Sequence, residues 1–112
     1  MQYALMIYAD PSSYESLPEA EREAIRAEFL ALADDARCVS TMHLQAAETA
    51  TCVRDAGGRT LMTDGPFADT KEVLGGVYVV EAPNLDEAIE LAARIPALRF
   101  GGVIEVRPVV AP

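Results

Sequence analysis

The chain has 112 residues, of which 51% are hydrophobic and 24% charged, and 18 acidic against 9 basic residues give a net charge of −9. This length fits a single domain over residues 1–112, and the apolar content is too high for a disordered chain. A surface this negative repels phosphate backbones and anionic lipids, so we expect no nucleic-acid and no membrane partner. The opening apolar run, residues 3–9, is too short for a membrane span and lacks a preceding positive charge, which predicts a cytoplasmic protein.

The predicted elements begin with a strand over residues 3–8, which is apolar on both faces. A polar loop over residues 10–17 follows, and then a helix over residues 18–37 that starts with a capping pattern, Ser-Leu-Pro-Glu. The helix carries one apolar stripe, and its other faces are charged and expected to be solvated. The stripe consists of Ile25, Phe29, Leu32, Ala33 and Ala36.

The middle of the chain is predicted to be β structure. Residues 38–44 form a second strand, and residues 49–54 and 59–63 form a hairpin around a turn at residues 55–58. An irregular segment over residues 64–72 then leads into the last third of the chain.

The last third returns to the order of strand, helix and strand. A strand over residues 77–80 precedes a helix that Asn84 caps and Pro96 ends, and an alternating strand covers residues 103–109. The apolar stripe of this second helix consists of Leu85, Ala88, Ile89, Ala92 and Ile95.

This order of elements predicts an α+β fold, a ferredoxin-like split β-α-β sandwich with an inserted β-hairpin. Right-handed crossovers place both helices on one face of the sheet. The strands at residues 3–8 and 77–80 are apolar on both faces, so the second face would expose a large apolar patch. No further element remains to cover it, and we therefore expect a homodimer that packs sheet to sheet.

The sequence contains no pattern typical of a metal or cofactor site, and we expect neither. Cys38 and Cys52 are too far apart in the chain for a metal-binding pair and are expected to be buried apolar thiols. The carboxylates of Asp64, Asp69 and Glu72 are of the type that binds magnesium, but loop carboxylates are commonly just solvated.

The irregular segment, DGPFADTKE over residues 64–72, holds three carboxylates, a hydroxyl and the only lysine. Two interpretations remain open. In the structural one, Asp64 caps a turn, Phe67 anchors the loop to the core and Lys71 pairs with a carboxylate. In the functional one, these polar groups converge at the mouth of the sheet, where small-ligand sites form.

This segment, followed by Leu-Gly-Gly at residues 74–76, resembles the signature of the DGPF branch of the YCII-related family. The resemblance extends over nearly the whole chain. It implies a dimeric α/β barrel of ferredoxin-like subunits and no settled activity. Further matching stretches are residues 3–8, 85–89, 93–96 and 100–108.

The resemblance also implies two roles for the family that bear on this chain. Some members place a His and an Asp together in a cleft, which suggests an enzyme, and some relatives accompany extracytoplasmic-function sigma factors. In those members the His lies in the first helix, but this chain has its only histidine, His43, in the second strand. The dyad therefore cannot be carried over, and Asp64 and His43 remain candidate catalytic residues, with a structural role for His43 as the alternative.

Three functions stay open: binding of a small organic ligand by a dimer, catalysis with Asp64 as general acid or base, and a regulatory partnership with a sigma factor. Arg94 and Arg99 bracket the end of the second helix, where they either clamp an anion or simply favour the helix dipole. Tyr8 ends the first strand and either lines the same cleft or sits at the sheet edge. The expected ligand-binding residues are Tyr8, Asp64, Gly65, Pro66, Phe67, Thr70, Lys71, Arg94 and Arg99.

Overall fold

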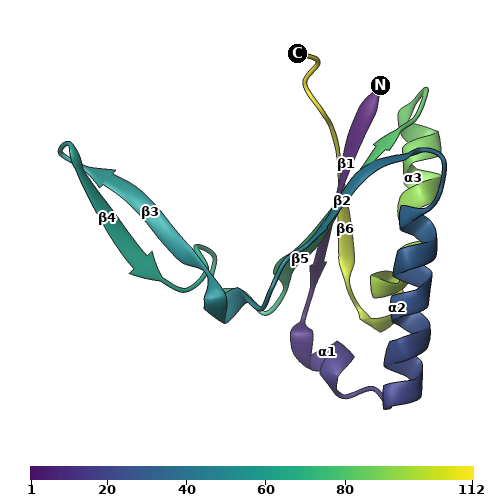
Figure 1. The fold of residues 1–112 in the computed structure, drawn as a ribbon, viewed down its shortest axis with the longest axis horizontal. Helices are drawn as coiled ribbons and strands as arrows, with labels where there is room; N and C mark the ends of the chain where they lie inside the picture. The colour runs from purple at the N-terminus through teal and green to yellow at the C-terminus, as the bar shows by residue number, and fades with distance from the viewer.

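The computed structural model describes all 112 residues and consists of a four-stranded sheet, a helix layer on one face of it, and a separate β-hairpin (Figure 1). The strand order is β2-β5-β1-β6, and every neighbouring pair is antiparallel. This is the order of a split β-α-β sandwich, so the predicted α+β class is confirmed. The sheet consists of β1 (Gln2–Ala9), β2 (Cys38–His43), β5 (Val73–Glu81) and β6 (Val103–Pro108).

The helices differ from the prediction mainly at their ends. A short helix forms where a loop was expected, because Asp10 accepts a hydrogen bond from the N–H of Ser12 (3.0 Å) and Pro11 favours the first helical position. None of the helices has the length and hydropathy that a membrane span requires. The helical elements are α1 (Pro11–Glu15), α2 (Glu19–Ala33), η1 (Ala47–Thr49), α3 (Leu85–Ala92) and η2 (Pro96–Phe100).

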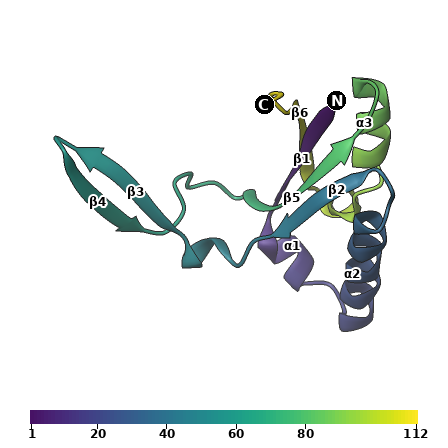
Figure 2. The ribbon, with the colours of Figure 1, turned by 45° about the horizontal axis from the view of Figure 1, so that its top comes forward.

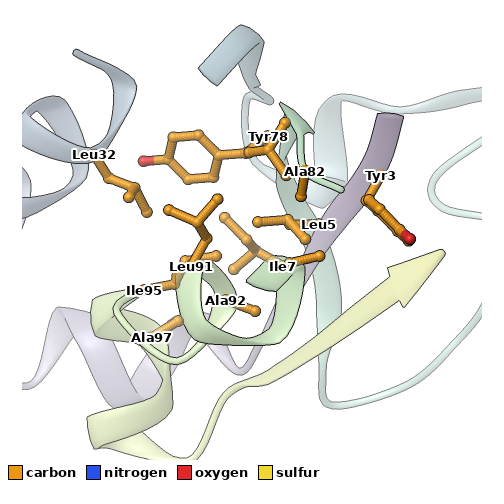
Figure 3. Close-up of a cluster of buried hydrophobic side chains, with 12 residues drawn as sticks. Tyr3, Leu5, Ile7, Leu32, Tyr78, Ala82, Leu91, Ala92, Ile95 and Ala97 are labelled. Atoms are coloured by element: carbon orange, nitrogen blue, oxygen red, sulfur yellow. The ribbon is translucent and has the colours of Figure 1, made fainter. Parts of the chain in front are cut away.

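The hydrophobic core lies between the sheet and the helix layer (Figure 3). Alternate residues of β1, among them Leu5, point toward the helices, as do Tyr78 and Val80 of β5. The hydroxyl of Tyr78 donates a hydrogen bond to the backbone oxygen of Phe29 in α2 (2.7 Å), which joins the sheet to the helix. Burial raises the pKa of Tyr78 to about 12.

The second helix buries three of the five residues predicted for its apolar stripe, Ala88, Ala92 and Ile95, but not the other two. Leu85 and Ile89 were assigned to the apolar stripe but are 48% and 47% exposed. The helix instead packs through a set that is spaced by three, four and seven residues, as one helical face requires. This set is Ala88, Leu91, Ala92 and Ile95.

No element covers the other face of the sheet, which we call the open face (Figure 2). Met6 lies opposite Val77, which in turn lies opposite Met42, and Met42 is 59% exposed. Strands β1 and β5 thus carry apolar side chains on both faces, as expected. On β6 the charged residues of this face, Glu105 and Arg107, form an ion pair (2.7 Å). The open face consists of Ala4, Met6, Tyr8, Ser40, Met42, Val77, Val79, Val103, Glu105 and Arg107.

The strand β5 begins at Val73, four residues before the predicted start at Val77, and it includes two glycines. Gly76 is needed there because the neighbouring strand β2 comes very close. A Cβ atom at position 76 would lie 2.9 Å from the backbone oxygen of Met42. Gly76 therefore lies within β5 and marks a close approach of two strands.

The hairpin of β3 (Thr51–Ala56) and β4 (Arg59–Asp64) projects away from the sheet, and we call residues 51–64 the arm (Figure 1). Its strands pair only with each other, around a turn in which Gly57 and Gly58 have φ of +60° and +85°. No residue of the arm is fully buried. The expectation of buried thiols was therefore wrong: Cys52 lies in the arm and Cys38 begins an edge strand, and both are only partly buried.

Candidate functional site

Several of the predicted site residues gather where β1 and β2 end and β5 begins, a region that we call the sheet end. Tyr8 pairs with Leu74, and His43, the last residue of β2, pairs with Gly76. Lys71 precedes β5 and lies close to Asp10, the residue that follows β1. The pKa of Asp10 is lowered there, mainly by hydrogen bonds from the side chain and backbone of Ser12 and also by the charge of Lys71.

The segment over residues 64–72 connects the arm to the sheet end and is ordered by local hydrogen bonds. The N–H of Gly65 donates to the backbone oxygen of Ala50 (2.8 Å), and the Cys52 thiol donates to that of Gly65 (3.3 Å). Gly65 has a φ of +98°, which suits glycine. The Thr70 hydroxyl donates to the backbone oxygen of Glu72 (2.6 Å).

The side chains of this segment do not behave as the structural interpretation requires. Asp64 makes no side-chain hydrogen bond and so caps no turn, and Lys71 forms no ion pair with any carboxylate, although its charge acts on Asp10. Phe67 is 78% exposed and does not anchor the loop to the core. Instead, the guanidinium group of Arg54 lies over its ring, 5.2 Å from the centroid. Pro66 is exposed as well.

Arg94 follows α3 and Arg99 lies in η2, so both belong to the helix layer. Figure 1 shows that the helices and the arm lie on opposite sides of the sheet. Both already bind carboxylates: Arg94 pairs with Asp35 (3.3 Å), and Arg99 pairs with Glu28, which raises the pKa of Arg99. Each lines a shallow hollow beside α2, of about 200 Å³ at Arg94 and 270 Å³ at Arg99. The structure therefore does not bring these arginines together with residues 64–72.

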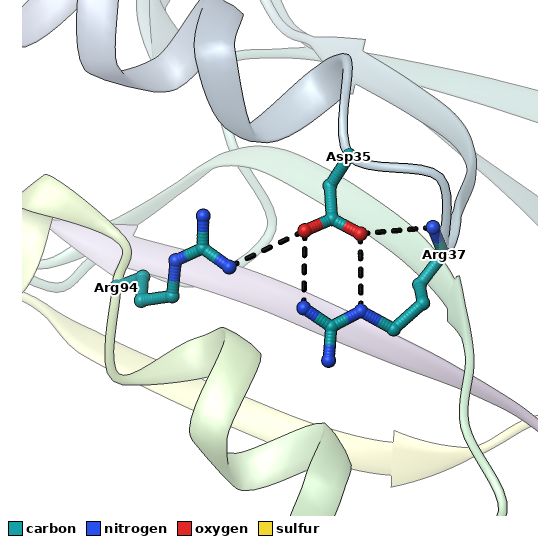
Figure 4. A network of polar contacts seen from close by, with 3 residues as sticks. All are labelled: Asp35, Arg37 and Arg94. Carbon is teal, nitrogen blue, oxygen red and sulfur yellow. Dashed lines mark hydrogen bonds and ion pairs between the residues drawn. The ribbon is translucent and has the colours of Figure 1, made fainter.

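The partner of Arg94 belongs to a small polar network at the end of α2 (Figure 4). Asp35 accepts hydrogen bonds from the Nε and Nη2 atoms of Arg37 (both 3.0 Å), from the Arg37 N–H (2.9 Å) and from Arg94. The Arg37 guanidinium, with its N–H and Arg94 assisting, holds the pKa of Asp35 well below its usual range. The network joins α2 and β2 to the end of α3 and is complete without a ligand.

The two candidate catalytic residues make no contact with each other. Asp64 ends β4 and His43 ends β2; both side chains are exposed, and no hydrogen bond or ion pair joins them. No group of three or more His, Cys, Asp or Glu side chains could hold a metal ion either. The geometry thus offers neither an acid–base pair nor a metal centre.

The cationic side chains differ in whether they form ion pairs. Four arginines of the main body, by which we mean the four-stranded sheet and its helices, form ion pairs with carboxylates. Arg22 and Arg26 of α2 form none, and neither do Arg54, Arg59 and Lys71, which lie on the arm and the segment after it. Arg54 was not singled out from the sequence. Its contact with Phe67 joins residues thirteen positions apart, and no local spacing rule predicts such a pair. The four paired arginines are Arg37, Arg94, Arg99 and Arg107.

Comparison with known proteins assigns the chain to a family. The sequence profile of the YCII-related domain matches residues 1–111. The chain belongs to the YCII-related family. A relative of this YCII-related protein, "Uncharacterized protein R00369" from Rhizobium meliloti (strain 1021), is 32% identical over 113 residues, which cover 96% of this chain and 91% of that protein.

Proposed function

We propose that this YCII-related protein is a homodimer that binds a small organic anion at the sheet end and does not convert it. The observation that carries the proposal is the surface that one chain leaves exposed. A monomer of its mass, 12.0 kDa, typically exposes roughly 6,000 Å². This chain exposes 7789 Å², about 1,800 Å² more. Two copies that hide this surplus bury a total within the range of obligate homodimers, roughly 2,000–5,000 Å².

The open face supplies the first part of the interface. Its centre is formed by partly exposed apolar side chains such as Met6, Val77 and Met42. Its charged residues, Glu105 and Arg107, lie on the edge strand and already neutralise each other. An apolar centre with a polar rim is the usual anatomy of a stable protein interface. Two such sheets pack face to face at a spacing of about 10 Å.

The charge distribution supports an anionic ligand at the sheet end. On a protein with a net charge of −9, cations without carboxylate partners are the groups left free to bind an anion. Lys71 is such a cation, and Arg54 is a second one beside the exposed ring of Phe67. Tyr8, which pairs with Leu74 at the sheet end, adds a hydroxyl donor on the open face. A small carboxylate with an apolar part suits these groups.

Catalysis by Asp64 and a partnership with a sigma factor have less support than ligand binding. Catalysis by Asp64 needs a second acid or base within hydrogen-bond reach, and His43 is not in contact with it. The sigma-factor partnership has only the family resemblance behind it. Capture of a sigma factor by the purified protein would revive that hypothesis.

The dimer is tested with one residue of the open face and a matched control. Met42→Lys places a charge on the open face at a side chain that is 59% exposed, and Leu30→Lys makes the equivalent change on α2 at 62% exposure. By sedimentation at micromolar concentration, the wild type and Leu30→Lys should have twice the mass of one 12.0 kDa chain, and Met42→Lys that of a monomer. A monomeric wild type would refute the proposal.

Ligand binding is tested by thermal shift with a panel of mono- and dicarboxylates and inorganic phosphate. At least one compound should raise the Tm of the wild type, and Lys71→Ala should abolish that shift. Arg26→Ala, which removes another unpaired cation from α2, should preserve it. If no compound stabilises the wild-type dimer, or if Lys71→Ala responds like the wild type, the ligand site is not where we place it.

A further inference from the structure

The arm exposes apolar side chains on both of its faces. Val53 and Met62 lie opposite each other across β3 and β4 and are 66% and 74% exposed. Leu61 points to the other face, is 52% exposed, and lies opposite Arg54. A two-stranded hairpin with no layer packed on it is only marginally stable in water. The arm therefore needs a surface outside its own chain.

The composition of the arm and the start of the following segment is that of a protein interface. Residues 51–67 contain Met62, Phe67, Arg54 and Arg59, residue types that are enriched in interfaces. Of the residue types that are depleted in interfaces, the stretch has no glutamate, lysine or serine and contains Asp55, Ala56 and Asp64. A protein surface suits the arm better than a free solvent environment does.

The area and the direction of the arm both point to a second copy of this chain. Four strands spaced by about 4.8 Å and some 20 Å long give the open face a footprint of roughly 400 Å², well below the surplus of about 1,800 Å². The arm supplies much of the remainder. In Figures 1 and 2 it leaves the sheet on the side away from the helices, which is the side of the open face. A copy seated on the open face therefore meets the arm.

The arm is long enough to reach along a second copy of the chain. Each of its strands has six residues and spans about 20 Å, which is twice the spacing of about 10 Å between packed sheets. The arm is long enough to pass the edge of the partner's sheet and lie along the side of the partner. A two-fold axis makes the contact reciprocal, so two identical arms cover two identical surfaces.

We infer that the arm of each copy clasps the other copy, that Val53 and Met62 are buried against it, and that the ligand site beside Lys71 is closed by the partner chain. The inference rests on the proposed dimer and adds a second contact to it. Because the segment after the arm joins the arm directly to the sheet end, a partner held by the arm lies next to Lys71. The site is thus complete only in the dimer.

Val53→Lys and Met62→Lys test the clasp, with Val110→Lys as the matched control in the C-terminal tail, where the side chain is 89% exposed. In a dilution series followed by sedimentation, each arm variant should raise the dimer Kd by about 100-fold or more, because a symmetric dimer contains the change twice. Val110→Lys should stay within about threefold of the wild type. In the monomeric Met42→Lys background, urea unfolding should show the same core stability for all three changes, because no arm residue belongs to the core.

The outcomes separate the inference from the proposed function. If both arm variants dimerise as tightly as the wild type while Met42→Lys is monomeric, the clasp is wrong and the sheet-to-sheet dimer stands. If the arm variants dissociate the dimer and Met42→Lys does not, the clasp stands and the open face is not the interface.

A cross-linking experiment identifies what covers the arm. Met62→p-benzoylphenylalanine is prepared in isotopically heavy and light chains, which are mixed and irradiated. Cross-links that join heavy to light chains are expected. Cross-links confined to one chain would overturn the inference, because the arm would then fold onto its own subunit.

Discussion

Leu5 and Val53 are both branched aliphatic residues in antiparallel strands, yet Leu5 is 0% exposed and Val53 is 66% exposed. Both strands have their ladder partners, so backbone pairing does not make the difference. What differs is the layer above the strands: α2, α3 and η2 cover one face of the main sheet, and nothing covers the arm. A β-sheet is buried by the layer packed on it, and a strand pair without a layer keeps its apolar side chains available for another chain.

The largest contrast is expected between neighbouring residues of β1 that point to opposite faces. Leu5→Ala leaves a cavity in the core and should lower the free energy of unfolding by about 3 kcal/mol. Met6→Ala, on the open face, should lower it by less than about 1 kcal/mol but weaken the dimer. Urea unfolding of both changes in the monomeric Met42→Lys background separates folding from association. If Leu5→Ala and Met6→Ala lowered the free energy of unfolding equally in the Met42→Lys background, the open face would be covered within one chain.

A pH dependence at the alkaline end is expected of the main body and not of the arm. Burial raises the pKa of Tyr78 to about 12, so the folded state holds this proton more tightly than the unfolded state. The resulting stability is complete below pH 10 and is lost as the pH rises toward 12, by about 2 kcal/mol in total.

The control for this prediction is a pair of tyrosine variants. Tyr78→Phe should lose about 1 kcal/mol at neutral pH with its hydrogen bond to Phe29 and should have a flatter stability profile between pH 10 and 12. Tyr14→Phe, near the surface, should keep the slope of the wild type. Parallel profiles for the wild type and Tyr78→Phe, measured by urea unfolding, would contradict the role of this hydroxyl.

The polar network at Asp35 tests whether the helix layer is held to the sheet by polar contacts as well as apolar ones. Asp35→Asn weakens the bonds to Arg37 and Arg94 and should lower the Tm at pH 7 by about 5 °C, whereas Asp34→Asn at the exposed neighbour should change it little. Because the pKa of Asp35 is lowered in the fold, its contribution is present above the ordinary aspartate range and fades as the pH falls through it. The Tm difference, followed by calorimetry, should therefore shrink from pH 5 to pH 2.

A substitution in the turn of the arm is expected to have the smallest effect on the stability of the four-stranded sheet and its helices. Gly57→Ala places a side chain at a φ of +60° and should destabilise the hairpin by about 1 kcal/mol. The dimer should weaken about fivefold, while the Tm of the monomeric Met42→Lys background should not change measurably. Hydrogen exchange of the β3 and β4 amides gives the local readout. A clear fall in that monomeric Tm would show that arm and main body unfold together.

Much of the main body could be predicted from the sequence because its signals are local. The order of the main strands and helices, the cap at Asn84 and the apolar second face of β1 all follow from neighbouring residues. The end of α3 does not, because the helix ends at Ala92 and Pro96 begins η2. The direction of the arm could not be predicted, since a hairpin has the same alternation and the same Gly-Gly turn whether it folds back or projects. Long-range side-chain partners were equally inaccessible: Arg94 meets Asp35 and Arg99 meets Glu28 across 59 and 71 residues.

The stripe of α3 shows a third kind of limit. Leu85 and Ile89 are apolar at helical spacing, and so are Ala88 and Leu91, so the periodicity alone allows two rotations of the helix. The structure adopts the rotation that places Leu91 against the core. The packing of η2 and the sheet decides this choice, and neither is visible in the eight residues of the helix.

Gly76 lies where β5 meets β2, the strand from which the chain continues into the arm. Because a methyl group there would press on the backbone of β2 at Met42, any other residue must push β2 away from β5, and β2 is the strand whose continuation carries the arm. If β2 tilts by a few tenths of an ångström at Gly76, the tip of the arm, whose strands are some 20 Å long, moves further than β2 does. A single substitution at Gly76 would thus displace the strand that leads into the arm, although its Cβ atom would also lie 3.7 Å from the core residue Ile7.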